Sequence, residues 1–453
     1  MSATFHSASQ RNGSVLVVVL CVCLGLVSIT LLFGHSMLMA YRGADNDLSG
    51  RQAEQAIDGA ARYVELLMAT AETPGLMPDI TSYESEAVPV GDATFWFLGR
   101  AAETTTNGTT RVFGLVDEAS KINLNMRVSD PQIFLDILGK LPGMTAELAA
   151  AIIDWRDADE DVTPGGAEAE TYNRQTPASS AKNADFESVE ELGLVSGATR
   201  LILYGEDTNL NGVLDANEDD GEINLPSDNS DGKLDPGILE YLTVFSKESN
   251  KQSDGTTARI NVTQPGTELT TLLTEKLSAS RANEIMASLG TTTRFNSVLA
   301  FYVRSGMKPE EFDLVSDSLT TSDGDSVAGL INVNTASETV LACLPGIDTD
   351  KASKIVSQRL GSATQSAGIA WVADILGPDG VEQAGPYLTG RSYQISADVA
   401  AVGRHGRGYR RTRFVIDNST GTPQIIYRRN LASLGWALGS DVRESFASTK
   451  GIQ

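Results

Sequence analysis

The feature that most constrains this chain is an uncharged apolar run near its N-terminus. Residues 14–40 contain no Asp, Glu, Lys or Arg and are rich in Val and Leu. At about 1.5 Å of rise per residue, a helix of this length exceeds the roughly 30 Å hydrocarbon core of a bilayer. The sequence therefore predicts one transmembrane segment, 14–40, and a body attached to it.

The residues before the run form a short polar leader, 1–13, which ends in Arg11-Asn-Gly13. A secretory signal would have a shorter apolar core, followed by a cleavage site with small residues. Here the plausible break lies on the polar side, between Gly13 and Ser14, so cleavage would leave the helix attached. An ordinary single-pass anchor in which Gly13 is incidental is the alternative.

The net charge and the cysteine positions of the chain argue against a nucleic-acid-binding protein and against a disulfide-stabilised one. The chain has 453 residues, enough for two or three domains, and a formal net charge of −24. So acidic a chain is a poor ligand for nucleic acid, whose binding depends on phosphate neutralisation. Cys21 and Cys23 lie in the apolar run and Cys343 lies far from them, so no disulfide framework is indicated.

The segments flanking the middle of the chain predict a small α+β body. Apolar residues between Ile57 and Met68 recur at three and four, which predicts that the first helix continues to Thr70. Residues 94–98 and 110–116 are short, aromatic and β-branched, and predict a hairpin. Three further strands, expected at 393–402, 409–416 and 424–429, would complete the same antiparallel sheet.

Between these parts the sequence repeats itself, which predicts an inserted helical domain. Ile122-Asn-Leu-Asn125 precedes two helices joined at Leu141-Pro-Gly143, and the same order returns at Ile331-Asn-Val-Asn334 and Leu344-Pro-Gly346. A weaker third copy starts at Ile260. The expected divisions are leader 1–13, transmembrane segment 14–40, first helix and strands 41–118, inserted helical domain 119–390, closing strands 391–438 and a flexible tail 439–453.

The two Pro-Gly turns are similar to helix-hairpin-helix turns, in which a tight bend exposes backbone N–H groups that can bind phosphate. Acidic residues lie where DNA would approach, however: Asp348 and Asp350 in the second copy, and the run that starts at Asp154 after the first. Like charges repel a nucleic acid backbone. A packing role is favoured, and DNA binding is kept as the alternative.

The segment 207–218 fits a calcium-loop template. Oxygen ligands are expected from alternate positions of a tight loop, with a glycine at the sixth position and a chelating carboxylate at the twelfth. The predicted ligands are Asp207, Asn209, Asn211, the carbonyl of Val213, Asp215 and Glu218, with Gly212 at the bend. An acidic Asn/Gly turn without an ion is the alternative.

A second, weaker calcium site is expected downstream at Asp228, Asp231 and Asp235, although Ser227 occupies the first template position. Catalytic residues are scarce, because the only histidines are His6, His35 and His405. No phosphate-binding glycine loop followed by Lys-Ser/Thr is present. The sequence therefore predicts no catalytic site, no cofactor other than structural calcium, and no enzyme.

One basic cluster lies on the closing strands. Its members could pair with acidic loops of the same chain or of a neighbouring subunit, or they could form a solvated edge, which we favour from sequence alone. They are Arg404, Arg407, Arg410, Arg411, Arg413, Arg428 and Arg429.

The leader resembles that of type IV prepilins. Counted from Ser14, the fifth residue is Val18, where most members of that family carry a glutamate. In this respect the chain resembles the K-type minor pseudopilin of type II secretion, as it does in residues 114–125, 150–167 and 188–192. The resemblance covers most of the chain. The segment 237–305 is a departure, because it makes the helical block larger than the family needs.

The resemblance implies a pilin-like fold, with a long N-terminal helix packed on a small antiparallel sheet and an inserted helical domain. It also implies an inner-membrane protein with a cytoplasmic N-terminus and a periplasmic body, processed by prepilin peptidase. Its expected partners are other minor pseudopilins in a tip complex that starts and caps the pseudopilus, and it is expected to carry calcium. The alternatives are a membrane-tethered DNA receptor of DNA uptake and a type IV pilus tip adhesin.

Overall fold

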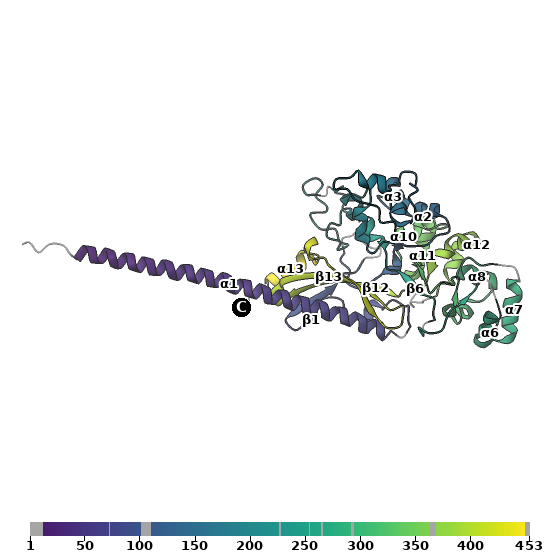
Figure 1. Cartoon of the computed structure of the whole chain (residues 1–453). Helices are drawn as coiled ribbons and strands as arrows, with labels where there is room; N and C mark the ends of the chain where they lie inside the picture. The colour runs from purple at the N-terminus through teal and green to yellow at the C-terminus, as the bar shows by residue number, and fades with distance from the viewer. Residues whose placement is uncertain are drawn as a thin grey trace, which may run out of the picture.

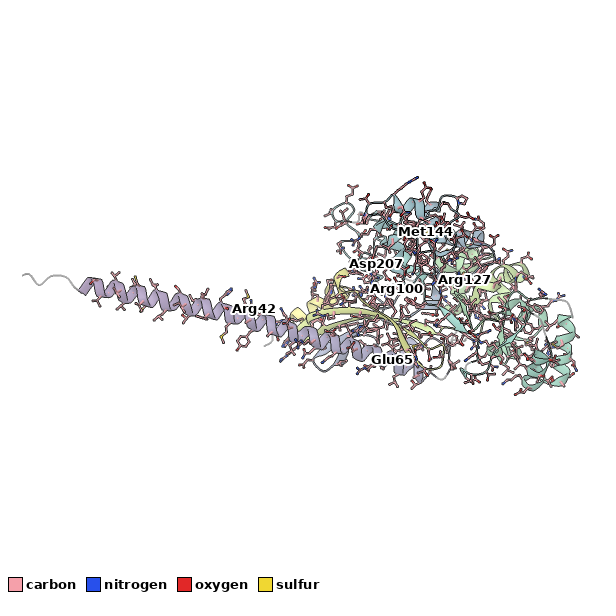
Figure 2. All side chains as sticks on the ribbon, in the orientation of Figure 1. Arg42, Glu65, Arg100, Arg127, Met144 and Asp207 are labelled. Atoms are coloured by element: carbon pink, nitrogen blue, oxygen red, sulfur yellow. The ribbon has the colours of Figure 1, made fainter. Side chains whose placement is uncertain are left out.

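The computed structural model describes residues 12–71, 73–100, 110–225, 228–252, 254–263, 266–290, 294–361 and 368–448. Its dominant element is the 58-residue helix α1 (Asn12–Ala69), which projects from the body as a long shaft (Figure 1). Residues 14–44 of the shaft are exposed throughout. This helix is long and apolar enough to cross a membrane, and Arg42 lies on the stretch between shaft and body (Figure 2).

The second half of α1 packs on an antiparallel sheet. The sheet order is β1 (Val88–Val90), β2 (Ala93–Phe97), β12 (Gln394–Gly403), β13 (Arg407–Asp417) and β14 (Gln424–Asn430), and β3 (Val116–Asp117) also pairs with β12. The helix buries the small residues Ala53, Ala56 and Ala60 completely. Small side chains let the helix axis approach the sheet closely, so the pilin-like packing of helix on sheet is confirmed.

The strands near the C-terminus complete the sheet begun by β2, as predicted, because Ala400 pairs with Trp96 across β12 and β2. The predicted hairpin of residues 94–98 with 110–116 is confirmed only in part. The two segments meet at the antiparallel bridge of Leu98 with Phe113, where the Gly114 N–H donates to the Phe97 carbonyl at 2.9 Å. Along most of its length, however, β2 lies between β1 and β12. Trp96 and Phe97 are both buried, which suits an internal strand rather than one of a two-stranded hairpin.

The inserted domain consists of three repeated units, each opened by an Ile-Asn strand and closed by a Leu-Thr strand that pairs with it in parallel. The pairs are β4 (Ile122–Asn123) with β5 (Leu242–Thr243), β7 (Ile260–Asn261) with β8 (Leu319–Thr320), and β10 (Ile331–Asn332) with β11 (Leu388–Thr389). The weaker third copy predicted at Ile260 is thus a complete unit. A further antiparallel pair, β6 (Lys247–Ser249) with β9 (Ser326–Ala328), joins the linkers between units.

Each unit encloses helices whose apolar faces share one core. The first unit holds α2 (Pro131–Gly139), α3 (Ala146–Arg156), α4 (Ala169–Asn173) and α5 (Arg200–Tyr204). The second holds α6 (Thr267–Lys276), α7 (Ala279–Leu289), α8 (Val298–Ser305) and α9 (Pro309–Asp313), and the third holds α10 (Glu338–Cys343), α11 (Thr349–Gly361) and α12 (Val372–Ala384).

The hydrogen bonds of the Asn and Thr side chains explain why the Ile-Asn and Leu-Thr sequences recur in the strand pairs. The side-chain oxygen of Asn123 accepts the backbone N–H of Asn125 at 2.7 Å, and Asn332 does the same for Asn334 at 3.0 Å. The hydroxyl oxygen of Thr243 accepts the N–H of Phe245 at 3.1 Å. These bonds satisfy backbone donors where a two-residue strand ends, which favours the same residues in every unit.

A buried polar contact joins the inserted domain to the sheet. Asp117, at the end of β3, accepts hydrogen bonds from Asn332 at 3.0 Å, from Thr335 at 2.5 Å and from Ser392. Burial raises the pKa of Asp117 to about 6, and these donors oppose the rise. The two parts of the molecule are therefore held by polar contacts as well as by the chain connections.

The tail predicted as flexible is ordered over residues 439–448, where it forms the helix α13 (Gly439–Ser448). Phe446 packs edge-on against Trp96 with ring centroids 6.3 Å apart, and Val442 joins the same cluster. The prediction is wrong for this segment because the polar composition hides two apolar positions, four apart, that face the sheet. Residues 449–453 lie outside the described residues.

Candidate functional site

The predicted processing site lies at the start of the shaft. Gly13 and Ser14 fall in the first turn of α1, and the leader residues 1–11 lie outside the described part of the chain. Val18 is 61% exposed on a shaft that the body does not cover. Cleavage between Gly13 and Ser14 stays a prediction from the sequence.

The predicted calcium loop follows α5 and closes on itself through Asp207. The Asp207 carboxylate accepts the backbone N–H groups of Asn211 at 2.9 Å and Gly212 at 2.8 Å. Gly212 has a φ of +71°, which a side chain would disfavour. The side-chain oxygen of Asn211 accepts the N–H of Val213 at 2.7 Å. The loop is therefore bent around its first carboxylate, as the template requires.

The remaining predicted ligands converge on the same space. The side-chain amides of Asn209 and Asn211 donate to Asp215 Oδ2 at 2.8 and 2.9 Å. Glu218 accepts the N–H of Asp215 at 3.1 Å, and it also bonds Thr208 near the start of the loop. The structure thus brings together the predicted side-chain ligands of this loop, namely Asp207, Asn209, Asn211, Asp215 and Glu218.

Two properties of the loop fit a cation. Asn209 Oδ1 is buried and has no hydrogen-bond partner, so a ligand oxygen is left open. Burial raises the pKa of Glu218 to about 7, with the charge of Asp207 adding to the effect, and burial also raises the pKa of Asp207. A hard cation would offset both costs, because it stabilises the ionised carboxylates.

The donor set is mixed rather than purely acidic. Within the described residues, no group of three or more His, Cys, Asp and Glu side chains is arranged as a metal centre. The case for the loop therefore depends on its amide and main-chain oxygens together with its carboxylates. Such sets suit calcium, which takes six to eight oxygen ligands in flexible geometry.

The second predicted loop repeats part of this bonding. Asp231 accepts the N–H of Lys233 at 2.9 Å, and the amide of Asn229 donates to Asp235 at 3.0 Å, as positions five and three do in the first loop. Asp228 is not part of that arrangement. Its carboxylate accepts backbone N–H groups of residues 220 and 221 instead, which lowers its pKa despite the cost of desolvation.

Two carboxylates that the sequence did not predict as ligands make the bonds expected of the first and last carboxylates of a calcium loop in this second loop. Asp219 accepts the N–H of Gly232 at 3.2 Å, the bond that Asp207 makes in the first loop. Glu206 accepts the N–H groups of Asn229 at 3.2 Å and Asp235 at 3.0 Å, much as Glu218 bonds its own loop. Both flank the first loop in sequence, so no spacing template could assign them to the second. Ser227 lies outside the described residues.

The first predicted loop is fixed to the sheet by a buried arginine. Arg411, on β13, is fully buried and pairs with Asp398 on β12 at 2.7 Å. Its guanidinium also donates to the backbone carbonyls of Asn209 and Leu210. Burial alone would raise the pKa of Asp398, but Arg411 and Arg413 hold it at about 2.

Arg100 makes a parallel contact from the end of β2. It donates to the Leu210 carbonyl at 3.0 Å and pairs with Glu240 at 2.8 Å. Figure 2 shows Arg100 and Asp207 together between the sheet and the helical domain. The loop therefore bridges the two parts of the molecule.

The basic cluster on the closing strands is mostly neutralised within the chain, so the interpretation as a solvated edge is wrong for most of its members. The solvated-edge interpretation did not take into account that α1 packs beside these strands and carries acidic side chains within reach of the arginines. The pairs are Arg407 with Asp45, Arg428 with Asp58, Arg429 with Glu190, and Arg411 and Arg413 with Asp398.

The two Pro-Gly turns join α2 to α3 and α10 to α11, with Gly143 at φ +72° and Gly346 at φ +76°. Nearby lysines bond backbone carbonyls. Lys351 donates to Gly346 at 2.9 Å, and Lys140 donates to Cys343 at 3.3 Å. Cations used in this way are poorly available to phosphate, and the arrangement supports packing between the hairpins.

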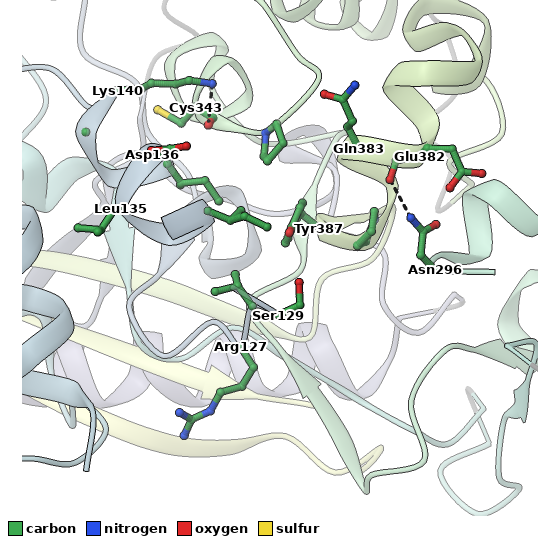
Figure 3. A pocket seen from close by; sticks show the side chains of 16 residues that line it. Arg127, Ser129, Leu135, Asp136, Lys140, Asn296, Cys343, Glu382, Gln383 and Tyr387 are labelled. Atoms are coloured by element: carbon green, nitrogen blue, oxygen red, sulfur yellow. Dashed lines mark hydrogen bonds between the residues drawn. The ribbon is translucent and has the colours of Figure 1, made fainter. Parts of the chain in front are cut away.

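A cavity of about 940 Å³ opens beside these hairpins, between α2 and the end of α12 (Figure 3). Arg127, Asp136, Lys140 and Tyr387 contribute to its wall, and Asn296 closes one side by donating to the Glu382 carbonyl at 2.8 Å. The wall combines apolar groups with few charges and contains no histidine. Nothing in this lining resembles a catalytic constellation.

Comparison with known proteins identifies two segments of the inserted domain. Residues 120–204 match a family model described as "Type II secretion system (T2SS), protein K", first part, and residues 331–390 match a second model with that description. These spans correspond to most of the first unit and to the third unit. No curated protein matches the sequence significantly.

A solved structure is also similar to the chain: the crystal structure of the GspK-GspI-GspJ complex from the enterotoxigenic Escherichia coli Type 2 Secretion System. The identity is 10%, the TM-score is 0.39, and the alignment covers 89% of this chain and 99% of that chain. The family assignment depends on the two family models. With both models matched in order behind a long apolar helix and a pilin-like sheet, this chain belongs to the protein K family of the type II secretion system.

Proposed function

We propose that this chain is a minor pseudopilin that starts and caps the pseudopilus of a type II secretion system. The observation that carries the proposal is the match of both protein K models within the inserted domain of a pilin-like body. The chain acts by assembly rather than by catalysis. The body is anchored in the inner membrane by α1, with the N-terminus in the cytoplasm and the globular part in the periplasm.

The shaft supplies the assembly contacts in this proposal. Its apolar surface from Ser14 to Tyr41 is not covered by the body, so helices of other minor pseudopilins can pack on it within the bilayer. Val18 replaces the glutamate by which most family members pair with the subunit ahead. A subunit with none ahead of it does not need that carboxylate, which would be costly in the bilayer.

The inserted domain supplies the cap. In Figure 1, α2 and α3 of this domain lie above the sheet, and α6, α7, α8 and α12 lie at the end of the body away from the shaft. Its bulk would block the addition of another subunit above it. Calcium in loop 207–218, and in the second loop with Asp231 and Asp235, would stiffen the contact with the sheet that Arg411 and Arg100 make.

Replacement of Gly13 by alanine tests the proposal. The proposed cut directly follows Gly13, so Gly13→Ala, which adds a methyl group beside that bond, is expected to leave an unprocessed precursor and to abolish secretion in cells that depend on this chain. Gly25→Ala is the matched control, because Gly25 lies in the same helix and has no atom within 4 Å of an added Cβ. Normal size and normal secretion of the Gly13 variant would refute the proposal.

A further inference from the structure

The end of the body from which the shaft leaves is built from three segments. They are the part of α1 just after the apolar run, the turn 404–406 between β12 and β13, and α13, which lies where the shaft leaves the body (Figure 1). The backbone N–H of Arg404 donates to Gln52 Oε1 at 3.4 Å. Gly406 lies so close to Phe446 of α13 that an added Cβ would come within 2.5 Å of that side chain. The three segments therefore form one surface, which we call the shaft-side end.

Two arginines of the basic cluster lie on the shaft-side end and make no ion pair among the described residues: Arg404 and Arg410. Both are exposed. The guanidinium of Arg410 lies over Gly50 of α1, where an added Cβ would be 2.7 Å from Nη2, and it donates to the Tyr409 carbonyl at 2.9 Å. Exposed guanidinium groups are well suited to phosphate, which they bind through two parallel hydrogen bonds.

A third exposed arginine, Arg443, lies over an aromatic ring at this end. Its guanidinium carbon is 4.9 Å from the centre of the Trp436 ring, and Trp436 in turn packs on Tyr409 with ring centroids 4.9 Å apart. Trp436 is partly exposed. Trp and Tyr are enriched where a membrane meets water, because their rings are apolar and their N–H or O–H groups are polar. An arginine stacked on such a ring is thus suited to a phospholipid headgroup.

The anchoring of α1 fixes how far the shaft-side end lies from the bilayer. The apolar surface of the helix ends at Tyr41, and Arg42 follows it between shaft and body (Figure 2). Contacts of the closing strands with α1 begin at Asp45 and reach Gln52, which lie about 6 and 16 Å beyond Tyr41 at about 1.5 Å per residue. The Debye length is about 10 Å at 0.1 M salt. Charges at this end therefore interact with charges on the membrane surface.

The charge of this end differs from that of the chain as a whole. The chain carries a formal net charge of −24, so an anionic surface repels it. Two acids of the shaft-side end are paired, Asp45 with Arg407 and Asp441 with Arg111. The exposed acids there lie near arginines in sequence or accept a hydrogen bond, namely Asp47 and Glu54 on either side of Arg51, Glu444 beside Arg443, and Asp92 with Gln52. The shaft-side end is therefore nearly neutral, and an anionic membrane repels it far less than the whole body.

We propose that the shaft-side end binds the anionic phospholipid headgroups of the bilayer that α1 spans, through Arg404, Arg410 and Arg443, with Trp436 at the headgroup level. The proposal rests on the membrane anchoring that is part of the proposed function. Acidic side chains of a neighbouring subunit share the chemistry of a headgroup phosphate, but only the bilayer is held beside this end by the chain itself. Headgroup contacts fix the orientation of the body on the membrane before the chain enters a filament.

Headgroup quenching of the full chain in lipid nanodiscs tests the proposal in the absence of any partner protein. One set of discs contains phosphatidylcholine alone, and the other contains phosphatidylcholine and phosphatidylglycerol in equal parts. Both carry the same trace of headgroup-spin-labelled phosphatidylcholine as quencher. The Trp436 signal is the difference in fluorescence between the unaltered chain and Trp436→Phe. We expect stronger quenching of this signal in the phosphatidylglycerol discs, and loss of the difference at about 1 M salt, where the Debye length is about 3 Å.

The double variant Arg404→Gln with Arg410→Gln removes two exposed charges from the shaft-side end. It should lower the ratio of docked to free bodies more than about tenfold, since one arginine near an anionic surface contributes about fivefold. Quenching in the phosphatidylglycerol discs should then fall to the level in phosphatidylcholine alone. Arg62→Gln is the matched control and should leave the quenching unchanged, because Arg62 is exposed on α1 about 30 Å further along the helix than Arg42.

Three results would count against the proposal. Equal quenching in the two kinds of disc, or quenching that the double variant does not change, would overturn it. If the double variant loses only its recovery with other minor pseudopilins, the arginines bind a protein and the proposal is equally overturned. Recovery of the chain with the discs measures anchoring separately, so a chain that enters neither kind of disc would refute the membrane anchoring of the proposed function, and this inference with it.

Discussion

At the scale of single residues, the fold depends on Arg411 more than its place among the many arginines of β13 and β14 suggests. Its guanidinium is buried between Asp398 and the carbonyls of loop 207–218. Removal of one partner of a buried ion pair leaves the other charged and without a partner, which typically costs about 3–5 kcal/mol. A surface pair of similar length contributes roughly 1 kcal/mol or less.

Arg411→Leu is therefore expected to destabilise the body by about 3–5 kcal/mol and to weaken calcium binding by loop 207–218. Chemical denaturation and calcium titration measure the two effects. Arg404→Leu is the control, because Arg404 is exposed on the turn before β13. A stability change no larger than the control's would mean that Arg411 does not hold the loop.

Glu168 gives a residue-scale prediction about pH. Its folded pKa, about 7, lies above the ordinary value of 4.5, so the protonated form is favoured by folding. Stability from this group is complete below about pH 4.5 and is lost as the pH rises through about 7. Without calcium, Glu168→Gln should therefore stabilise the chain at mildly alkaline pH, by on the order of 2 kcal/mol, and have little effect in acid. A destabilised variant at alkaline pH in chelator would contradict this.

At the scale of elements, the loops and repeats are predictable to different degrees. The members of loop 207–218 can be named from sequence because they all lie within one stretch with a fixed spacing. Asp219 and Glu206 could not be predicted from such a template, because they bond to the second loop but lie outside its stretch of sequence. The hairpin prediction is only partly right because periodicity shows that a segment is a strand but does not show which strand lies beside it.

Loss of the first loop's carboxylates supplies an element-scale prediction. Asp207→Ala with Glu218→Ala should abolish most of the calcium-dependent rise in melting temperature. Glu222→Gln, an exposed acid of the neighbouring segment, should leave that rise intact. Melting curves recorded with calcium and with chelator decide the matter. If the double variant responds to calcium as the unaltered chain does, the loop is not a calcium site.

At the scale of the whole molecule, the sequence indicates a shaft, a sheet and an inserted helical block, and the structure confirms this arrangement. The order of the segment that starts at Gly439 is not predictable locally, because α13 depends on tertiary contacts of Phe446. The acids around Asp154 look in sequence only like charges that repel DNA, since burial cannot be judged from composition. Both errors concern contacts between segments that local patterns do not reveal.

The measurement that most directly tests the pseudopilin assignment is the N-terminal residue of the chain isolated from membranes together with its helix-bearing partners. We expect a polypeptide that begins at Ser14 and is recovered in one complex with other minor pseudopilins. A chain that still begins at Met1, or one that is recovered alone, would contradict the assignment.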